Sequence, residues 1–119
     1  MKLATALLLV GLCTPSWAAE GAFESAGALL KYMTGSDIEP KLRGFYSGYA
    51  LGYVVGIADV QDGVRNPTTG FCFDLPAGVN KGLIFQAVKG HLESRPESGR
   101  RAAETLVQEA LARAFPCKI

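Results

Sequence analysis

Apolar residues recur three or four positions apart in several stretches of the chain, with polar residues between them. This spacing gathers the apolar side chains on one face of a helix. The pattern predicts a first helix over residues 23–33, a second ending near residue 62, a third over 81–94 and a fourth over 99–115. Residues 63–79 carry turn signals instead, which predict a long loop. We therefore expect an all-α fold, a small four- to five-helix bundle.

The predicted helices have recognisable ends. Gly35 follows the first helix and can adopt the left-handed conformation that closes one. Ser36 or Asp37 can cap the second helix, and Pro40 then falls in its first turn, where a missing N–H costs nothing. Asn80 is a suitable cap for the third helix. On the fourth helix the predicted solvent-facing residues are Arg101, Glu104, Gln108, Glu109 and Arg113.

The second helix carries a glycine at every fourth position: Gly44, Gly48, Gly52 and Gly56. Almost all the positions between them are apolar or aromatic, which predicts a central helix buried on all sides. The glycines then form a ridge against which another helix packs closely. That helix belongs either to the same chain or to a second copy. On either interpretation, Gly52→Leu should damage the fold or the dimer before it affects specificity.

Spaced glycines also occur at helix contacts in membranes. The uncharged run here covers about fifteen residues, whereas a helix needs about 20 to cross a bilayer. Asp59, Asp62 and Arg65 follow it closely and are unsuited to hydrocarbon. We therefore predict no membrane span.

Residues 1–18 have the pattern of a signal peptide, with a basic residue, an apolar run and a cleavage site after Ala18. The expected mature chain, residues 19–119, is a single exported domain, periplasmic if the source is a Gram-negative bacterium. Without Lys2 the 12 basic residues become 11, equal to the 11 acidic residues. This balance gives no indication of a nucleic-acid partner.

Removal of the signal peptide leaves two cysteines, Cys72 and Cys117. An even number of cysteines without metal-ligand spacing predicts a disulfide in an oxidising compartment. The bond would stabilise the fold by about 4 kcal/mol in the chain-entropy model. If the chain is not exported, both remain free thiols.

The side chains offer little for catalysis. His91 is the single histidine, so no histidine pair can hold a metal, and no thiolate remains once the disulfide forms. We predict no enzyme activity and no cofactor. Asp59 adjoins the glycine ridge, and its favoured role is a buried or half-buried structural hydrogen bond. Tyr53 shares a stripe with Tyr49 and Phe45, which favours packing in the core over contact with a partner.

Four segments of the sequence, in this order, are GYALGYVVGIADV, FCFDLPAGV, IFQAVKGHLESRPE and ALARAFPC. Together they resemble the Rap/Tai-type immunity proteins of type VI secretion systems. The resemblance extends from about residue 26 to 117 and includes Cys72, Pro76, Gly78 and Val79 at the turn. It implies a small all-helical periplasmic protein, often a homodimer. Such proteins bind cell-wall-cleaving amidase effectors and occlude their catalytic cleft with helices and a projecting loop.

The loop is therefore the expected region of contact with a protein partner, an amidase effector. The candidate contact residues are Asp62, Arg65, Asn66 and Asp74. Replacement of residues 65–67 by glycines should weaken binding without lowering thermal stability. A second interpretation also remains open, because small disulfide-linked helical proteins also serve as periplasmic chaperones or stress proteins.

Overall fold

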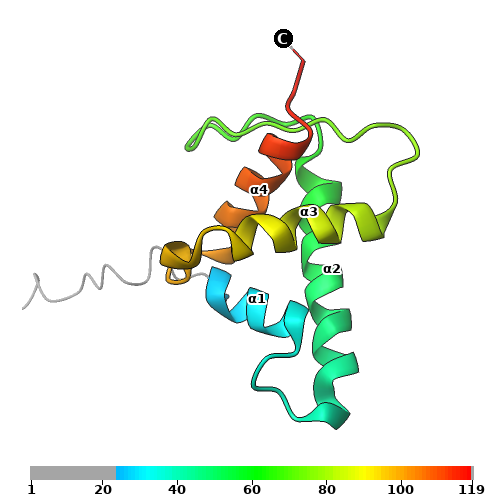
Figure 1. Cartoon of the computed structure of the whole chain (residues 1–119). Coiled ribbons are helices and arrows are strands. Elements are labelled where there is room, and N and C mark those ends of the chain that lie inside the picture. The colour runs from blue at the N-terminus through cyan, green and yellow to red at the C-terminus, as the bar shows by residue number, and fades with distance from the viewer. Residues whose placement is uncertain (1–23, 119) are drawn as a thin grey trace, which may run out of the picture.

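The computed structural model describes residues 24–118, and within them it contains four α-helices and two short 3₁₀ turns. Figure 1 shows α2 as the longest element, with α1 and α4 beside it and α3 running across it. Each of the other three helices packs against α2. The predicted all-α fold is confirmed. In chain order the elements are α1 (Ala26–Thr34), η3 (Pro40–Leu42), α2 (Arg43–Gln61), α3 (Lys81–Glu93), η4 (Pro96–Ser98) and α4 (Ala103–Ala114). The predicted signal peptide, residues 1–18, lies outside the described residues.

Two of the predicted helix ends are confirmed and one is wrong. Gly35 closes α1 with φ 77°. The Asn80 side chain accepts a hydrogen bond from the Leu83 N–H at the start of α3. Neither Ser36 nor Asp37 caps α2, because η3 intervenes and begins with Pro40. Asp37 lies in the preceding turn with φ 57°.

The helix α4 begins at Ala103, four residues later than position 99 predicted from the sequence. The backbone before it is bound to the start of α1 instead of continuing the helix. Ala26 N–H donates to Arg101 O at 2.8 Å, and Gly27 N–H donates to Gly99 O at 2.9 Å. These bonds satisfy backbone groups at the start of α1 that have no partner within that helix.

The core contains apolar side chains from all four helices. Leu29, Val54, Val88, Leu106 and Leu111 are all completely buried. On α2 the buried residues form one narrow stripe at every fourth position: Ala50, Val54 and Ala58. The helix is therefore buried along one face only, and the prediction that it is buried on all sides is wrong.

The glycine ridge lies on the opposite face of α2. Gly52 and Gly56 follow Ala50 and Val54 by two positions, which is about 200° around a helix. A Cβ atom added at Gly44, Gly48, Gly52 or Gly56 would meet no other atom within 4 Å. Within the described chain, therefore, no helix packs against the ridge. The sequence shows apolar residues on both faces and so could not indicate which face is buried.

Apolar side chains are exposed beside this ridge. Phe45 is 68% exposed and Val60 is 72% exposed. Tyr53 is half-buried and packs against the core, as predicted. Tyr49 is exposed, and its hydroxyl donates a hydrogen bond to Glu24 Oε2 at 2.7 Å. Asp59 is exposed, so the buried or half-buried role predicted for it is wrong.

Two polar residues of α4 predicted to face solvent are buried. Gln108 is 3% exposed and Glu109 is 7% exposed. Their polar groups have partners: Asn66, 42 residues away, for Gln108, and three arginines for Glu109, of which Arg113 lies one turn along the same helix. Burial of such groups is acceptable only with partners of this kind.

No helix among the described residues combines the length and apolarity needed to cross a membrane.

The open ridge predicts that Gly48→Ala and Gly56→Ala stabilise the isolated chain. Each substitution should raise the free energy of unfolding by about 0.5–1 kcal/mol, because alanine favours a helix more than glycine does. Urea unfolding in dilute solution measures the change.

Gly27→Ala is the matched control, because its Cβ would lie 3.2 Å from Gly99 O. It should gain less stability than the ridge substitutions or lose stability. A loss of stability in Gly48→Ala or Gly56→Ala would contradict an open ridge.

Candidate functional site

The loop of residues 62–80 leaves the end of α2 and returns to the start of α3 (Figure 1). Its first half doubles back on itself through three backbone hydrogen bonds. Gly63 N–H donates to Phe73 O at 2.8 Å, Asn66 N–H to Phe71 O at 2.9 Å, and Gly70 N–H to Asn66 O at 2.8 Å. The loop thus has a defined conformation although it contains no helix.

Asn66 is the side chain that fixes this conformation. Its Oδ1 accepts hydrogen bonds from the Thr68 N–H at 2.8 Å and the Thr69 N–H at 3.1 Å. Its Nδ2 donates to Oε1 of the buried Gln108 on α4 at 2.7 Å. Nearby, Arg65 Nη1 donates to Gly70 O at 2.8 Å. Asn66 therefore shapes the turn and attaches it to the bundle.

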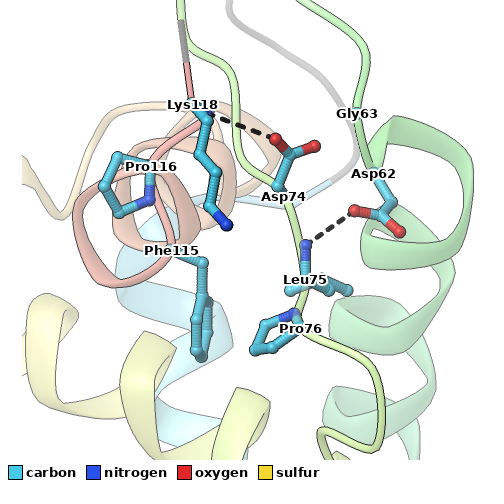
Figure 2. A pocket seen from close by; sticks show the side chains of 8 residues that line it. All are labelled: Asp62, Gly63, Asp74, Leu75, Pro76, Phe115, Pro116 and Lys118. Carbon is cyan, nitrogen blue, oxygen red and sulfur yellow. Dashed lines mark hydrogen bonds between the residues drawn. The ribbon is translucent and has the colours of Figure 1, made fainter.

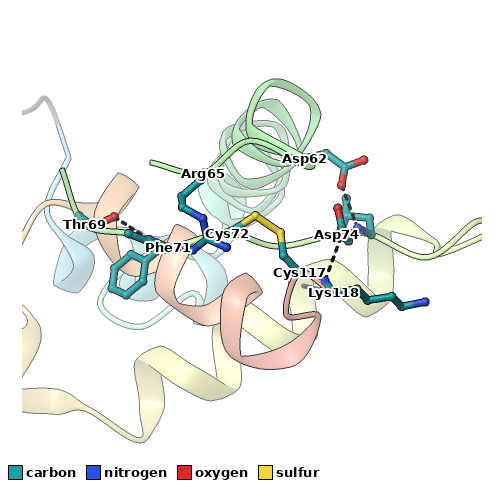
Figure 3. The surroundings of a disulfide bond; sticks show 10 residues. Asp62, Arg65, Thr69, Phe71, Cys72, Asp74, Cys117 and Lys118 are labelled. Carbon is teal, nitrogen blue, oxygen red and sulfur yellow. Dashed lines mark hydrogen bonds between the residues drawn. A yellow bond between two sulfur atoms is a disulfide. The ribbon is translucent and has the colours of Figure 1, made fainter. Parts of the chain in front are cut away.

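The disulfide predicted between Cys72 and Cys117 is present, with the two Cα atoms 5.5 Å apart (Figure 3). Beside it, Asp74 N–H donates to Phe115 O at 2.9 Å, and Phe73 is 1% exposed. The helices α3 and α4 cross each other (Figure 1). It is the path of the loop that carries Cys72 to the end of α4.

An open groove of about 510 Å³ lies next to the disulfide. Figure 2 shows two carboxylates beside it, each bound to a backbone N–H. Asp62 Oδ1 accepts from the Leu75 N–H at 2.8 Å, and Asp74 Oδ2 accepts from the Lys118 N–H at 3.4 Å. The groove is lined by Asp62, Gly63, Asp74, Leu75, Pro76, Phe115, Pro116 and Lys118.

The structure thus brings the four candidate contact residues to the same end of the molecule. Asp62, Arg65 and Asp74 are exposed, whereas Asn66 is half-buried. Each of the four also holds the loop through a hydrogen bond. Replacement of Asn66 by glycine should therefore lower stability, so the variant of residues 65–67 cannot separate binding from folding. Sequence reasoning missed Gln108, because its partner lies 42 residues away and no local pattern marks the pair.

A metal ion at this end of the molecule would need several ligating side chains close together. Residues 24–118 contain no cluster of three or more histidine, cysteine, aspartate or glutamate side chains suited to a metal ion. The groove combines apolar walls from Leu75, Pro76 and Phe115 with two carboxylates and one lysine.

A family model for Rap1a immunity proteins matches residues 5–117 of the sequence. The chain belongs to the Rap1a family of immunity proteins. The resemblance seen in the sequence motifs is thereby confirmed. Membership of this family implies an immunity function, in which the chain binds a protein effector. No curated protein sequence matches the chain.

The single histidine of this Rap1a-family chain lies on α3, at the centre of a group of charges. The side chain of His91 is 9% exposed, and its Nε2 lies 3.4 Å from Glu109 Oε2. Nε2 has no hydrogen-bond partner of suitable geometry among the described residues. Burial lowers the pKa of His91 below 6.5, and Arg95 and Arg113 lower it further, while Glu109 acts in the opposite direction.

This shift predicts that acid destabilises the fold. The unfolded chain takes up a proton at His91 as the pH falls through 6.5, whereas the folded chain takes it up only at a lower pH. The free energy of unfolding contributed by His91 is therefore complete above pH 6.5 and decreases below it. Denaturant unfolding at a series of pH values measures this dependence.

His91→Gln serves as the control, because it leaves Glu109 and the arginines in place and has no titrating ring. The variant should lose less stability than the parent chain between about pH 7 and pH 5. Equal losses in the two proteins would contradict the prediction.

Proposed function

We propose that this chain is a periplasmic immunity protein that binds a type VI secretion effector with peptidoglycan amidase activity. By occluding the effector's active site, it protects the cell that produces both proteins. The observation that carries the proposal is the family match, which extends over residues 5–117. The signal-peptide pattern of residues 1–18 supports an exported chain.

The loop end is the part of the surface best suited to enter a catalytic cleft. The loop projects from the end of α2. Its residue Val64 is 51% exposed. The disulfide and the Asn66 hydrogen bonds hold it in one conformation before any partner arrives. A preorganised loop loses little conformational entropy on binding, which favours a tight complex.

The open face of α2 supports a second element of the proposal, a homodimer. Its glycines leave the helix backbone accessible, and Phe45 and Val60 supply exposed apolar area beside it. A groove of about 340 Å³ follows this face, between Gly52 and Glu104. Successive glycines of the ridge lie four residues apart, so the row turns by about 40° around the helix axis from one glycine to the next. Such a row suits one inclined crossing of two copies of α2.

We predict that the chain forms a complex of roughly nanomolar Kd with the amidase effector encoded beside it. Co-expression should protect cells that produce the effector in the periplasm, and the two proteins should co-purify. Absence of both binding and protection would refute this function. Suppression of client aggregation at acid pH without such a complex would favour the chaperone alternative.

Val64→Arg should weaken that complex. The substitution places a positive charge on the exposed surface of the loop and leaves the hydrogen bonds that shape the loop in place. Leu42→Arg is the control. Leu42 is 42% exposed and precedes the other end of α2. An equal effect of the two substitutions on Kd would contradict a contact at the loop end.

The dimer is tested by Gly52→Leu, which we expect to shift the protein to monomer while it remains folded. Sedimentation velocity measures the oligomeric state, and circular dichroism measures the fold. Gly90→Leu on α3 is the matched control, because a Cβ at Gly90 also meets no atom within 4 Å. A parent chain that is monomeric at about 100 µM would contradict the dimer.

A further inference from the structure

Three arginines and His91 converge on one carboxylate on α4. Oε2 of Glu109 lies 3.8 Å from Arg95 Nε and 3.8 Å from Arg113 Nε, and its Oε1 lies 3.5 Å from Arg101 Nη1. The Glu109 side chain is itself 9% exposed. We refer to Arg95, Arg101, Arg113 and Glu109 as the arginine cluster.

The positive charge of the arginine cluster exceeds what Glu109 requires. A buried carboxylate needs a cationic partner, and one guanidinium can supply both of its hydrogen bonds. Here three guanidinium groups surround one carboxylate. No other acidic side chain among residues 24–118 forms an ion pair with any of them, and Glu93 nearby pairs with Lys89 at 3.6 Å. Two positive charges of the cluster therefore have no ion-pair partner of their own among the described residues.

The donor groups of the cluster are also incompletely used. Each guanidinium carries about five N–H donors. Within the described residues, the ion-pair contacts to Glu109 account for all the polar contacts of the Arg95, Arg101 and Arg113 side chains. Their side chains are 31%, 47% and 61% exposed, in that order. The donors can therefore be reached from solvent.

We propose that the arginine cluster is a docking site for an acidic segment of a partner protein. Aspartate or glutamate carboxylates of that segment take the guanidinium donors that Glu109 leaves free. Glu109 holds the three arginines together by reducing their mutual repulsion, so the site is assembled before the partner binds.

A protein carboxylate fits the cluster better than a small free anion does. The arginine side chains lie at an open surface, where a small anion keeps most of its water. A protein surface excludes water on contact, and this strengthens the interaction between the charges.

This inference does not rest on the proposed function. The arginine cluster comes from the end of α3, the segment before α4 and α4 itself, whereas the projecting loop precedes α3. An experiment without any effector can therefore test the docking site, and its result leaves the immunity function unaffected.

The test is a titration of the ¹⁵N-labelled chain with a blocked peptide of about six glutamates, followed by NMR of the arginine Nε–H groups. We expect saturable shifts at Arg95, Arg101 and Arg113 that weaken as salt rises from about 0.02 M to about 0.3 M. A glutamine peptide of the same length should give none. The double variant Arg101→Ala, Arg113→Ala should weaken the peptide Kd by about fivefold or more.

Arg100→Ala is the matched control, because Arg100 adjoins Arg101 and forms no ion pair with Glu109. The double variant removes side chains that are 47% and 61% exposed, so the fold should remain. Absence of saturation, or an equal loss in Arg100→Ala, would overturn the proposal. Inorganic phosphate titrated in parallel should bind more weakly than the peptide, and equal or tighter binding would overturn the assignment to a protein carboxylate.

Discussion

A narrow stripe of small side chains on α2 is the contact on which the arrangement of the bundle depends. Ala50, Val54 and Ala58 are short, so α1, α3 and α4 can all approach the same helix. Because the stripe occupies one side of α2, the opposite side of that helix lies outside the core. The open glycine ridge and the exposed aromatic side chains follow from this division of α2 into two faces.

Much of the fold could be predicted from local signals in the sequence. Gly35 and Asn80 mark helix ends through chemistry that acts within a few residues, and the parity of the cysteines indicated the disulfide. The orientation of α2 could not be predicted, because both of its faces are apolar. The burial of Glu109 was also unforeseen, since polarity alone places a glutamate outside and two of its three arginines, Arg95 and Arg101, lie outside α4.

The same distinction applies to the candidate site. Turn signals in the sequence located the loop. The resemblance of four motifs indicated the family of the chain, and the family match over residues 5–117 established it. The partners of its side chains were not predictable, because the bond from Asn66 to Gln108 spans 42 residues. Residues that a sequence suggests as contact points can thus be the ones that hold a loop in shape. Contact is better tested at exposed neighbours such as Val64.

The bond between Cys72 and Cys117 also determines the order in which the molecule can be completed during biosynthesis. Cys117 follows α4, so the cross-link cannot close until the last helix has been made. Until then Cys72 carries a free thiol, and the loop lacks its covalent link to the end of α4. A nascent chain interrupted before Cys117 would retain Cys72 as an unpaired cysteine, open to reaction with other thiols.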